Sequence, residues 1–253
     1  MNNKISGTNQ TMSKTRKVYF ARLFGRCGIF LLIASLYMFN ESCFEVLKGW
    51  NFFKGFSVLH IMWAIWLVDM IIQLIPVNAN ISIGSQKQFL SRFKPIKENL
   101  NYQKLKNHIV STTKSAYKVF VLWCVLTLAI GALYTTGIID AKTVFLISTF
   151  FYVADLICVL VWCPFRLIMK NKCCTTCRIF NWDHLMMFSP FVFVAGFYTQ
   201  SLFLFAFVIW FIWEICIIVY PERFSEKTNV ALRCSECTDK LCTQYCRKLR
   251  KDK

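Results

Sequence analysis

Long, uninterrupted apolar stretches constrain this chain more than any other feature of its sequence. The first four are residues 19–39, 56–77, 119–139 and 143–163. A helix needs about 20 residues to cross the hydrocarbon core of a bilayer, so each stretch is long enough for one membrane span. Hydrophobic residues make up 56% of the chain, more than the core of one soluble domain uses, which agrees with a membrane protein.

A fifth apolar stretch, residues 185–220, is too long for a single span. As one helix it would measure about 54 Å, whereas the hydrocarbon core is about 30 Å thick. The polar residues from Tyr198 to Ser201 predict a turn that divides it into spans at 185–198 and 202–220. The sequence therefore predicts an all-α integral membrane protein, a six-helix transmembrane bundle.

Positive charge predicts the orientation of this bundle, because cytoplasmic loops collect Lys and Arg. Of the 30 basic residues, 27 lie in the N-terminal segment through Arg26, between the second and third spans, between the fourth and fifth, or after the sixth. The others, Lys48, Lys54 and Lys142, fall in the alternate loops. We therefore expect a multi-pass protein of the inner (cytoplasmic) membrane with both N- and C-termini cytosolic.

The cytosolic loop of residues 78–118 is basic, and from Phe89 onward its apolar residues recur at a helical spacing. This pattern predicts a juxtamembrane helix, divided at Pro95, whose lysines contact the bilayer at anionic lipid headgroups. Arg22 and Arg26 are likewise expected to extend from the first span to the inner headgroups. No nucleic-acid-binding motif accompanies the charge, so a nucleic-acid partner is not expected.

Cysteines gather in two stretches that this topology places in the cytosol, a Cys-rich loop of residues 163–184 and a basic tail of residues 221–253. The candidate metal ligands in them are Cys173, Cys174, Cys177, Cys234, Cys237, Cys242 and Cys246. Cytosolic thiols are kept reduced, which favours metal ligation over disulfide bonds. Together the two stretches are expected to form a small Cys-rich cytosolic cap.

The cysteine spacing permits two kinds of metal site. In one, the four tail cysteines close a site alone as C-x2-C-x4-C-x3-C, a pattern loosely similar to iron-sulfur runs. In the other, the pairs Cys174/Cys177 and Cys234/Cys237 form one four-thiolate site suited to zinc. Both sites are closed to substrate, which favours a structural or electron-transfer role. Unliganded cysteines in a disordered tail are the alternative.

Three acidic residues, Asp69, Asp155 and Glu214, lie inside the predicted spans. Ionisable residues at membrane depth are costly and usually face the bundle interior. They are expected either to form an ion or proton path or to act as packing contacts between helices, and the sequence leaves both readings open. Asp183 is expected to cap the fifth helix, and His184 to lie at the interface or complete a metal site.

The expected function is that of a membrane component with a cytosolic cysteine-ligated centre, zinc or an iron-sulfur cluster. Such a centre would serve electron transfer with a membrane or redox protein partner, or organise the cytosolic face. The alternative is a small ion- or proton-coupled transporter that uses the intramembrane acids, with a purely structural metal. Only one of the three histidines lies within a span, which excludes a transmembrane cytochrome with paired axial histidines. The sequence does not decide whether the protein is an enzyme.

Overall fold

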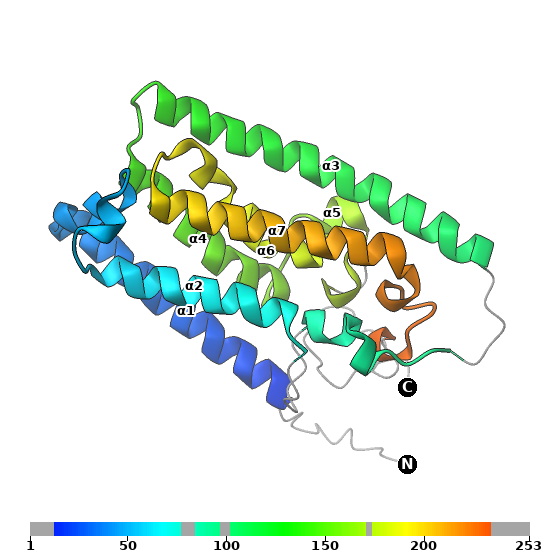
Figure 1. Ribbon diagram of the computed structural model, residues 1–253. Helices are drawn as coiled ribbons and strands as arrows, with labels where there is room; N and C mark the ends of the chain where they lie inside the picture. Colours follow the sequence, from blue (N-terminus) through cyan, green and yellow to red (C-terminus); the bar gives the residue numbers. More distant parts are fainter. Residues whose placement is uncertain (1–12, 77–83, 97–101, 171–173, 234–253) are drawn as a thin grey trace, which may run out of the picture.

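The fold is all-α wherever the structure describes the chain. The computed structural model describes residues 13–76, 84–96, 102–170 and 174–233 (Figure 1). Its α-helices are α1 (Lys14–Phe39), α2 (Val58–Leu74), α3 (Tyr102–Thr135), α4 (Ala141–Leu160), α5 (Arg166–Met169), α6 (Asp183–Phe188) and α7 (Phe197–Val219). Its 3-10 helices are η1 (Glu41–Leu47), η2 (Asn51–Phe53), η3 (Gly84–Gln88), η4 (Leu90–Arg92), η5 (Cys174–Thr176), η6 (Phe180–Trp182), η7 (Ser189–Phe193), η8 (Pro221–Phe224) and η9 (Val230–Leu232). The expectation of an all-α fold is confirmed for these residues.

Four helices of the described chain are long and apolar enough to cross a membrane. They are α1, the part of α3 from Leu105 to Thr135, α4 and α7. Helix α2 is also apolar but has only 17 residues. These lengths and compositions are those of a membrane protein, and the five helices overlap the first four apolar stretches and the second half of the fifth.

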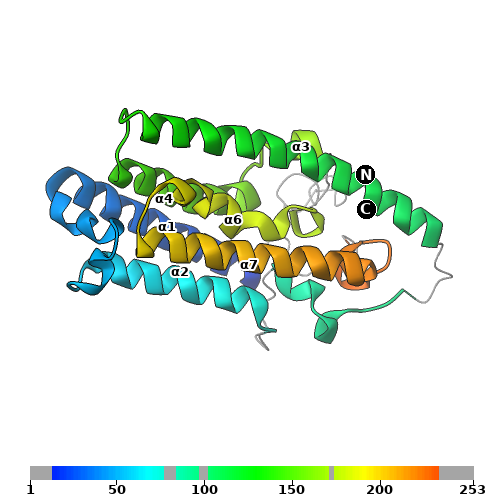
Figure 2. The same cartoon turned by 45° about the horizontal axis from the view of Figure 1, so that its top comes forward.

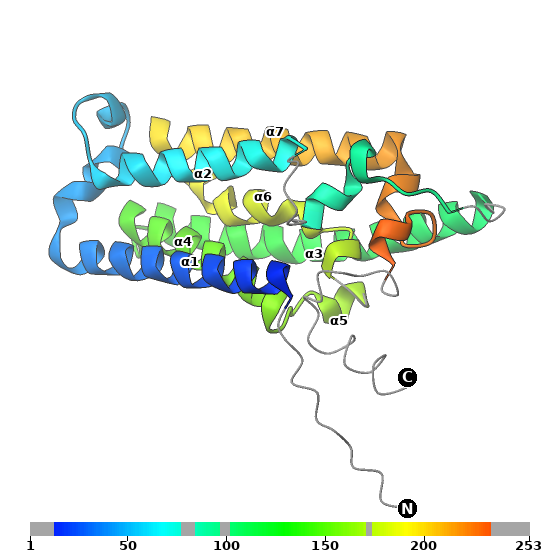
Figure 3. The same cartoon turned by 90° about the horizontal axis from the view of Figure 1, so that it is seen from below.

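The helices pack in two layers with α6 between them (Figure 3). Helices α2 and α7 pair in one layer and α1 and α4 in the other, while α3 contacts η7, α4 and α5 (Figure 2). Helix α1 begins and α7 ends at the same end of the bundle (Figure 1). We call this the cysteine end, after Cys163, Cys174 and Cys177, and we call the opposite end, with η1, η2 and Gly196, the loop end.

Local capping and turn chemistry fixes where several helices begin and end. The backbone N–H of Ser57 donates to Nδ1 of His60 at 2.9 Å, and the Ser57 hydroxyl caps the first turn of α2. The Asp140 carboxylate accepts the backbone N–H of Thr143 at 2.9 Å at the start of α4. Between α3 and α4 the chain turns at Gly137, whose φ of +76° favours glycine.

The loop end is closed by direct contact between two backbone segments. The N–H of Gly49 donates to the carbonyl of Ala195 at 2.9 Å, and the N–H of Phe197 donates to the carbonyl of Gly49 at 2.8 Å. A Cβ atom at Gly196 would lie 1.9 Å from the backbone oxygen of Leu47. Glycine is therefore required at residue 196, because any side chain would separate the segments.

The turn expected from Tyr198 to Ser201 is wrong, because these residues form the first turn of α7. Their polar side chains form hydrogen bonds with neighbouring groups, and the helix continues through them. The Thr199 hydroxyl donates to the carbonyl of Val194 at 2.8 Å, and the Ser201 hydroxyl accepts the indole N–H of Trp63 at 2.9 Å. The chain reverses earlier, at residues 194–196.

The segment expected to form the fifth span, residues 185–198, is not one helix. It consists of the six-residue α6 and the five-residue η7, which is followed by the reversal before α7. Pro190 at the start of η7 lacks the N–H that would continue the α-helical hydrogen bonds. The segment is nevertheless deeply buried, since Phe188 and Phe191 are both 0% exposed.

In the described part of the basic loop, residues 84–96 and 102–118, the apolar residues from Phe89 onward do not form a separate juxtamembrane helix. Instead η3 and η4 lead into an extended segment in which Pro95 pairs with Asn229, the residue that precedes η9. The side-chain amide of Asn229 also donates to the carbonyl of Lys87 at 3.1 Å. From Tyr102 the chain is already α3, which continues without a break into the third span.

Candidate functional site

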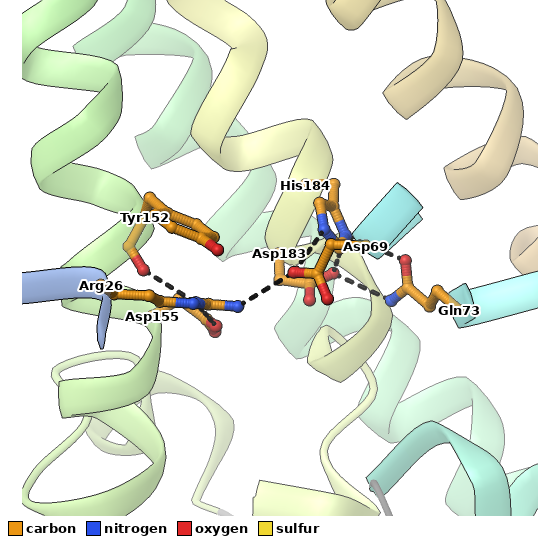
Figure 4. A network of polar contacts seen from close by, with 7 residues as sticks. All are labelled: Arg26, Asp69, Gln73, Tyr152, Asp155, Asp183 and His184. Atoms are coloured by element: carbon orange, nitrogen blue, oxygen red, sulfur yellow. Dashed lines mark hydrogen bonds and ion pairs between the residues drawn. The ribbon is translucent and has the colours of Figure 1, made fainter. Parts of the chain in front are cut away.

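A buried arginine joins the two acidic residues that lie in α2 and α4. The Arg26 guanidinium, from α1, lies 2.9 Å from Asp155 Oδ2 and 3.3 Å from Asp69 Oδ2 (Figure 4). It also donates to the carbonyl of Tyr152 at 2.8 Å and lies 3.9 Å from the centre of the Tyr152 ring. Asp69 and Asp155, which lie far apart in the sequence, therefore belong to one site.

The expectation that Arg26 extends to the headgroups is wrong. Its side chain is only 10% exposed, and all of its contacts described above point into the bundle. A buried guanidinium without partners would be strongly unfavourable, so two carboxylates and a carbonyl offset the loss of hydration. Arg22, one turn earlier, is half-buried and lines a small adjoining cavity of about 60 Å³.

Helix α6 adds a histidine and a third carboxylate to this site. His184 Nδ1 lies 3.0 Å from Gln73 Oε1 and 3.3 Å from Asp183 Oδ1, and its Nε2 lies 3.6 Å from Asp69 Oδ2 (Figure 4). The Gln73 amide in turn donates to Asp183 Oδ1 at 3.0 Å. Both imidazole nitrogens thus face oxygen acceptors, an arrangement that a protonated, positively charged histidine satisfies.

The expected roles of Asp183 and His184 are both corrected. Asp183 is the first residue of α6, and Trp182 precedes it as the cap residue without a side-chain cap bond. Its carboxylate binds Gln73 and His184 instead, because α6 begins inside the bundle and not at its surface. His184 is 6% exposed, so it lies in the interior and not at the interface.

We call the set Arg26, Asp69, Gln73, Tyr152, Asp155, Asp183 and His184 the Arg26 cluster. Its acids can carry three negative charges, whereas Arg26 and a protonated His184 supply two positive charges. Arg22 lines the adjoining cavity and its positive charge acts on Asp69, but among the described residues no ion pair joins it to these acids. The cluster is therefore able to accept a proton or another cation.

Glu214 belongs to a separate and more closed group, the Glu214 cluster of Arg178, Trp182 and Glu214. The Arg178 guanidinium binds both carboxylate oxygens of Glu214, and one of these contacts, from Nη1 to Oε1, is 2.7 Å long. The indole N–H of Trp182 donates to the same oxygen at 2.7 Å. This bidentate pair matches one cation to one acid.

A larger cavity at the cysteine end lies beside the Arg26 cluster. Its volume is about 260 Å³, and its lining includes Cys158, Cys163, Cys174 and Cys177 together with Asp155. Cys158 lies in the last turns of α4, and Cys163 lies just beyond the end of this helix. Cys174 Sγ lies 3.8 Å from the carbonyl oxygen of Cys158.

Most of the expected metal ligands lie where the structure does not describe the chain. Cys174 and Cys177 are described, and both are half-buried at the cysteine end. Among the described residues, no group of three or more His, Cys, Asp or Glu side chains is arranged to hold a metal ion. The ligands outside the described ranges are Cys173, Cys234, Cys237, Cys242 and Cys246.

Comparison with known proteins gives no relative: no family model matches the chain, and neither a curated protein nor a solved structure matches it.

Proposed function

We propose that this protein is a proton- or cation-coupled transporter in which the Arg26 cluster is the coupling site. The chain passes through the cytoplasmic membrane six times, with α6 and η7 making the fifth passage and both termini in the cytosol. The cysteine end is then the cytosolic end, where the basic loop and tail contact anionic lipid headgroups. Three of the 30 basic residues, Lys48, Lys54 and Lys142, fall in the loops assigned to the opposite side of the membrane.

One observation carries this proposal, namely that the three acids of the Arg26 cluster outnumber the cations that pair with them directly. A cluster with a purely structural role is best served by equal numbers of acids and cations, because an unmatched buried charge is strongly unfavourable. Here Asp183 has Gln73 and His184 as partners, and the described chain pairs it with no arginine or lysine. Uptake of a proton or cation removes this imbalance, and its release restores it.

Charge movement after a pH jump tests the proposal without knowledge of the substrate. The full-length protein is reconstituted in liposomes on a solid-supported membrane, and the transient current is recorded. Asp155→Asn should remove most of the current, because it keeps a hydrogen-bonding group and deletes the charge. Asp140→Asn, the same change at the loop end, should leave the current intact. An unchanged current in Asp155→Asn, or no current in the wild type, contradicts the proposal.

A cytosolic metal cap is a second candidate, compatible with transport, and a specific observation favours it. Cys177 lines a cavity of about 30 Å³ together with Phe224 and Ser225, which lie at the start of the tail. The loop cysteines and the start of the tail therefore approach one another, as one site formed by Cys174, Cys177, Cys234 and Cys237 requires. Zinc suits four thiolates, and an iron-sulfur cluster is the other choice.

Metal analysis of anaerobically purified protein, with an optical spectrum, tests this second candidate. A joint site predicts that Cys174→Ser and Cys234→Ser both release the metal. A site formed by the tail alone predicts that only changes such as Cys242→Ser and Cys246→Ser release it. Absence of metal from the wild-type protein contradicts both arrangements.

A further inference from the structure

The 260 Å³ cavity at the cysteine end combines aromatic walls with two carboxylates. The aromatic lining residues are Trp123, Phe150, Phe151, Trp162, Phe165 and Phe180. Asp155 and Asp183 lie at the side shared with the Arg26 cluster. The cavity volume approaches that of small-molecule sites, which begin at about 300 Å³. The cavity is thus large enough for a small organic molecule and is not only a packing defect.

The carboxylates remain accessible although they are bound within the Arg26 cluster. The Asp155 side chain is 28% exposed and that of Asp183 is 24% exposed, whereas the Arg26 side chain is 10% exposed. Arg166 is the basic residue among the described lining residues, and it follows the end of α4. A neutral apolar occupant would displace the water that hydrates these carboxylates and offer no polar contact in its place. A cation would compensate the carboxylates for this loss of hydration.

The walls of the cavity favour a cation with an apolar body. Aromatic rings attract cations through their negative faces, and they also exclude water from hydrocarbon groups. The rim is apolar as well, since Phe150 and Trp162 are each 51% exposed and Val161 is 58% exposed. On a bundle that spans a membrane, such a rim allows entry from the bilayer.

We propose that this cavity binds an amphipathic organic cation, with its cationic group toward Asp155 and Asp183 and its apolar part against the aromatic wall. The inference rests on the proposed transport function and names its substrate class. Binding at this place brings the cationic group to the acids that otherwise accept a proton. Substrate and proton therefore compete for the same carboxylates, which couples the movement of one to that of the other.

A matched pair of probes tests the charge requirement on the full-length protein in nanodiscs. Phenyltrimethylammonium is an organic cation, and tert-butylbenzene has the same shape without the charge. Scintillation proximity should detect saturable binding of tritiated phenyltrimethylammonium. Unlabelled tert-butylbenzene should compete at least about tenfold more weakly than the unlabelled cation. Equal competition by the two probes overturns the inference, because the site would then select shape alone.

Two variants locate the probe. Asp183→Asn should weaken binding of phenyltrimethylammonium about tenfold, while Asp140→Asn, an identical change at the loop end, should have no effect. Ala154→Phe fills the cavity without changing a charge and should abolish binding. Unchanged binding in a folded Ala154→Phe variant overturns the assignment of the cavity, even if Asp183→Asn fails to fold.

The inference and the proposed function fail in different ways. If the cation does not bind but the pH-jump current persists and depends on Asp155, the substrate class is wrong and the coupling site stands. If the current is absent or independent of Asp155, the proposed function is wrong whatever the cavity binds.

Discussion

The Arg26 cluster and the Glu214 cluster are built from the same kinds of residue but differ in charge balance and access. Arg178 binds both oxygens of one carboxylate, and Trp182 supplies a further donor to it. Arg26 instead divides its donors between Asp69 and Asp155, whose side chains are 24% and 28% exposed. The Glu214 cluster is thus a matched ion pair. The Arg26 cluster has more acids than directly paired cations, and it lies beside two cavities.

The difference teaches that an intramembrane acid cannot be assigned a role from its position alone. Glu214 and Asp155 both face the bundle interior and both accept from an arginine. The Glu214 cluster has no unmatched charge to exchange, so its expected role is to fix the loop before α6 to α7. The Arg26 cluster is able to exchange charge, and mutations in the two clusters should therefore have different consequences.

The largest effect is expected from Arg178→Gln, because it leaves the Glu214 carboxylate without its cation. Loss of one member of a buried ion pair costs about 3 to 5 kcal/mol. The double variant Arg178→Met with Glu214→Gln should recover most of this loss, since it removes both charges and keeps an acceptor for Trp182. Unfolding in detergent, followed by circular dichroism, measures both variants. A double variant as unstable as Arg178→Gln would mean that the pair acts in some other way.

Arg26→Gln should cost less, about 2 kcal/mol at neutral pH, because its acids keep His184, Gln73 and cavity access as partial compensation. The loss should shrink as the pH falls, since protonation removes the negative charge that Arg26 no longer balances. The free energies of unfolding of the wild type and Arg26→Gln, measured at pH 7 and at pH 5, test whether the loss of stability shrinks in this way. A loss that grows as the pH falls would show that the remaining acids are not the source of the instability.

Gln73→Leu should have a smaller effect, about 1 kcal/mol, since it removes the amide between Asp183 and His184 but leaves these two groups 3.3 Å apart. It should also alter the pH-jump current, because the amide orients both groups. Ser201→Ala is a matched control that deletes one side-chain hydrogen bond to Trp63 far from the cluster. A current changed equally by both variants would remove the amide from the coupling site.

The smallest effect on stability is expected from a change at Asp140, which lies at the loop end, outside both clusters. Partial burial alone would raise its pKa, but hydrogen bonds from Thr143 and the nearby Lys142 ammonium together lower the pKa below its usual value. Asp140→Asn should cost a few tenths of a kcal/mol, because exposed charges are screened. Folding lowers this pKa, so the contribution is present above the unfolded-chain value of about 3.9 and disappears as the pH falls through the folded value. The free energies of unfolding of the wild type and Asp140→Asn, measured across this pH range, test this expectation. A difference between them that persists at the lowest pH would mean that it comes from packing and not from the Asp140 charge.

The long helices could be predicted from sequence because span length and hydropathy are local properties. Helices α1, α2 and α4 lie close to the expected ranges, and α3 and α7 differ from them mainly at their N-terminal ends. The turn at Tyr198 could not be placed correctly, since polar side chains at a helix start and at a turn look alike in a sequence. What decides between them is the position of the bonding partner, here the carbonyl of Val194.

The site was predictable only in part, for a similar reason. Asp69, Asp155 and Glu214 stand out because acids are rare within apolar stretches. Arg26 and His184 were not assigned to this site, since each lies near the end of an apolar stretch, where basic residues usually reach water. The available signal was that Arg22 and Arg26 are the only Lys or Arg residues within the predicted spans, which makes them the natural partners for three acids at membrane depth.

The contact at Gly196 has a consequence for how the helices can move. The backbone at Gly196 meets the Leu47 oxygen so closely that even a methyl group would collide with it, so the two segments cannot slide past one another there. The hydrogen bonds that join Gly49 to Ala195 and Phe197 hold the start of α7 in place, so we expect a tilt of α7 against its neighbours to pivot near this glycine. The 23-residue helix is about 35 Å long, and a tilt of about 5° moves its far end by about 3 Å. Displacement is thus smallest at the loop end and greatest at the cysteine end, where Ile217 of α7 lines the small cavity that also contains Cys177.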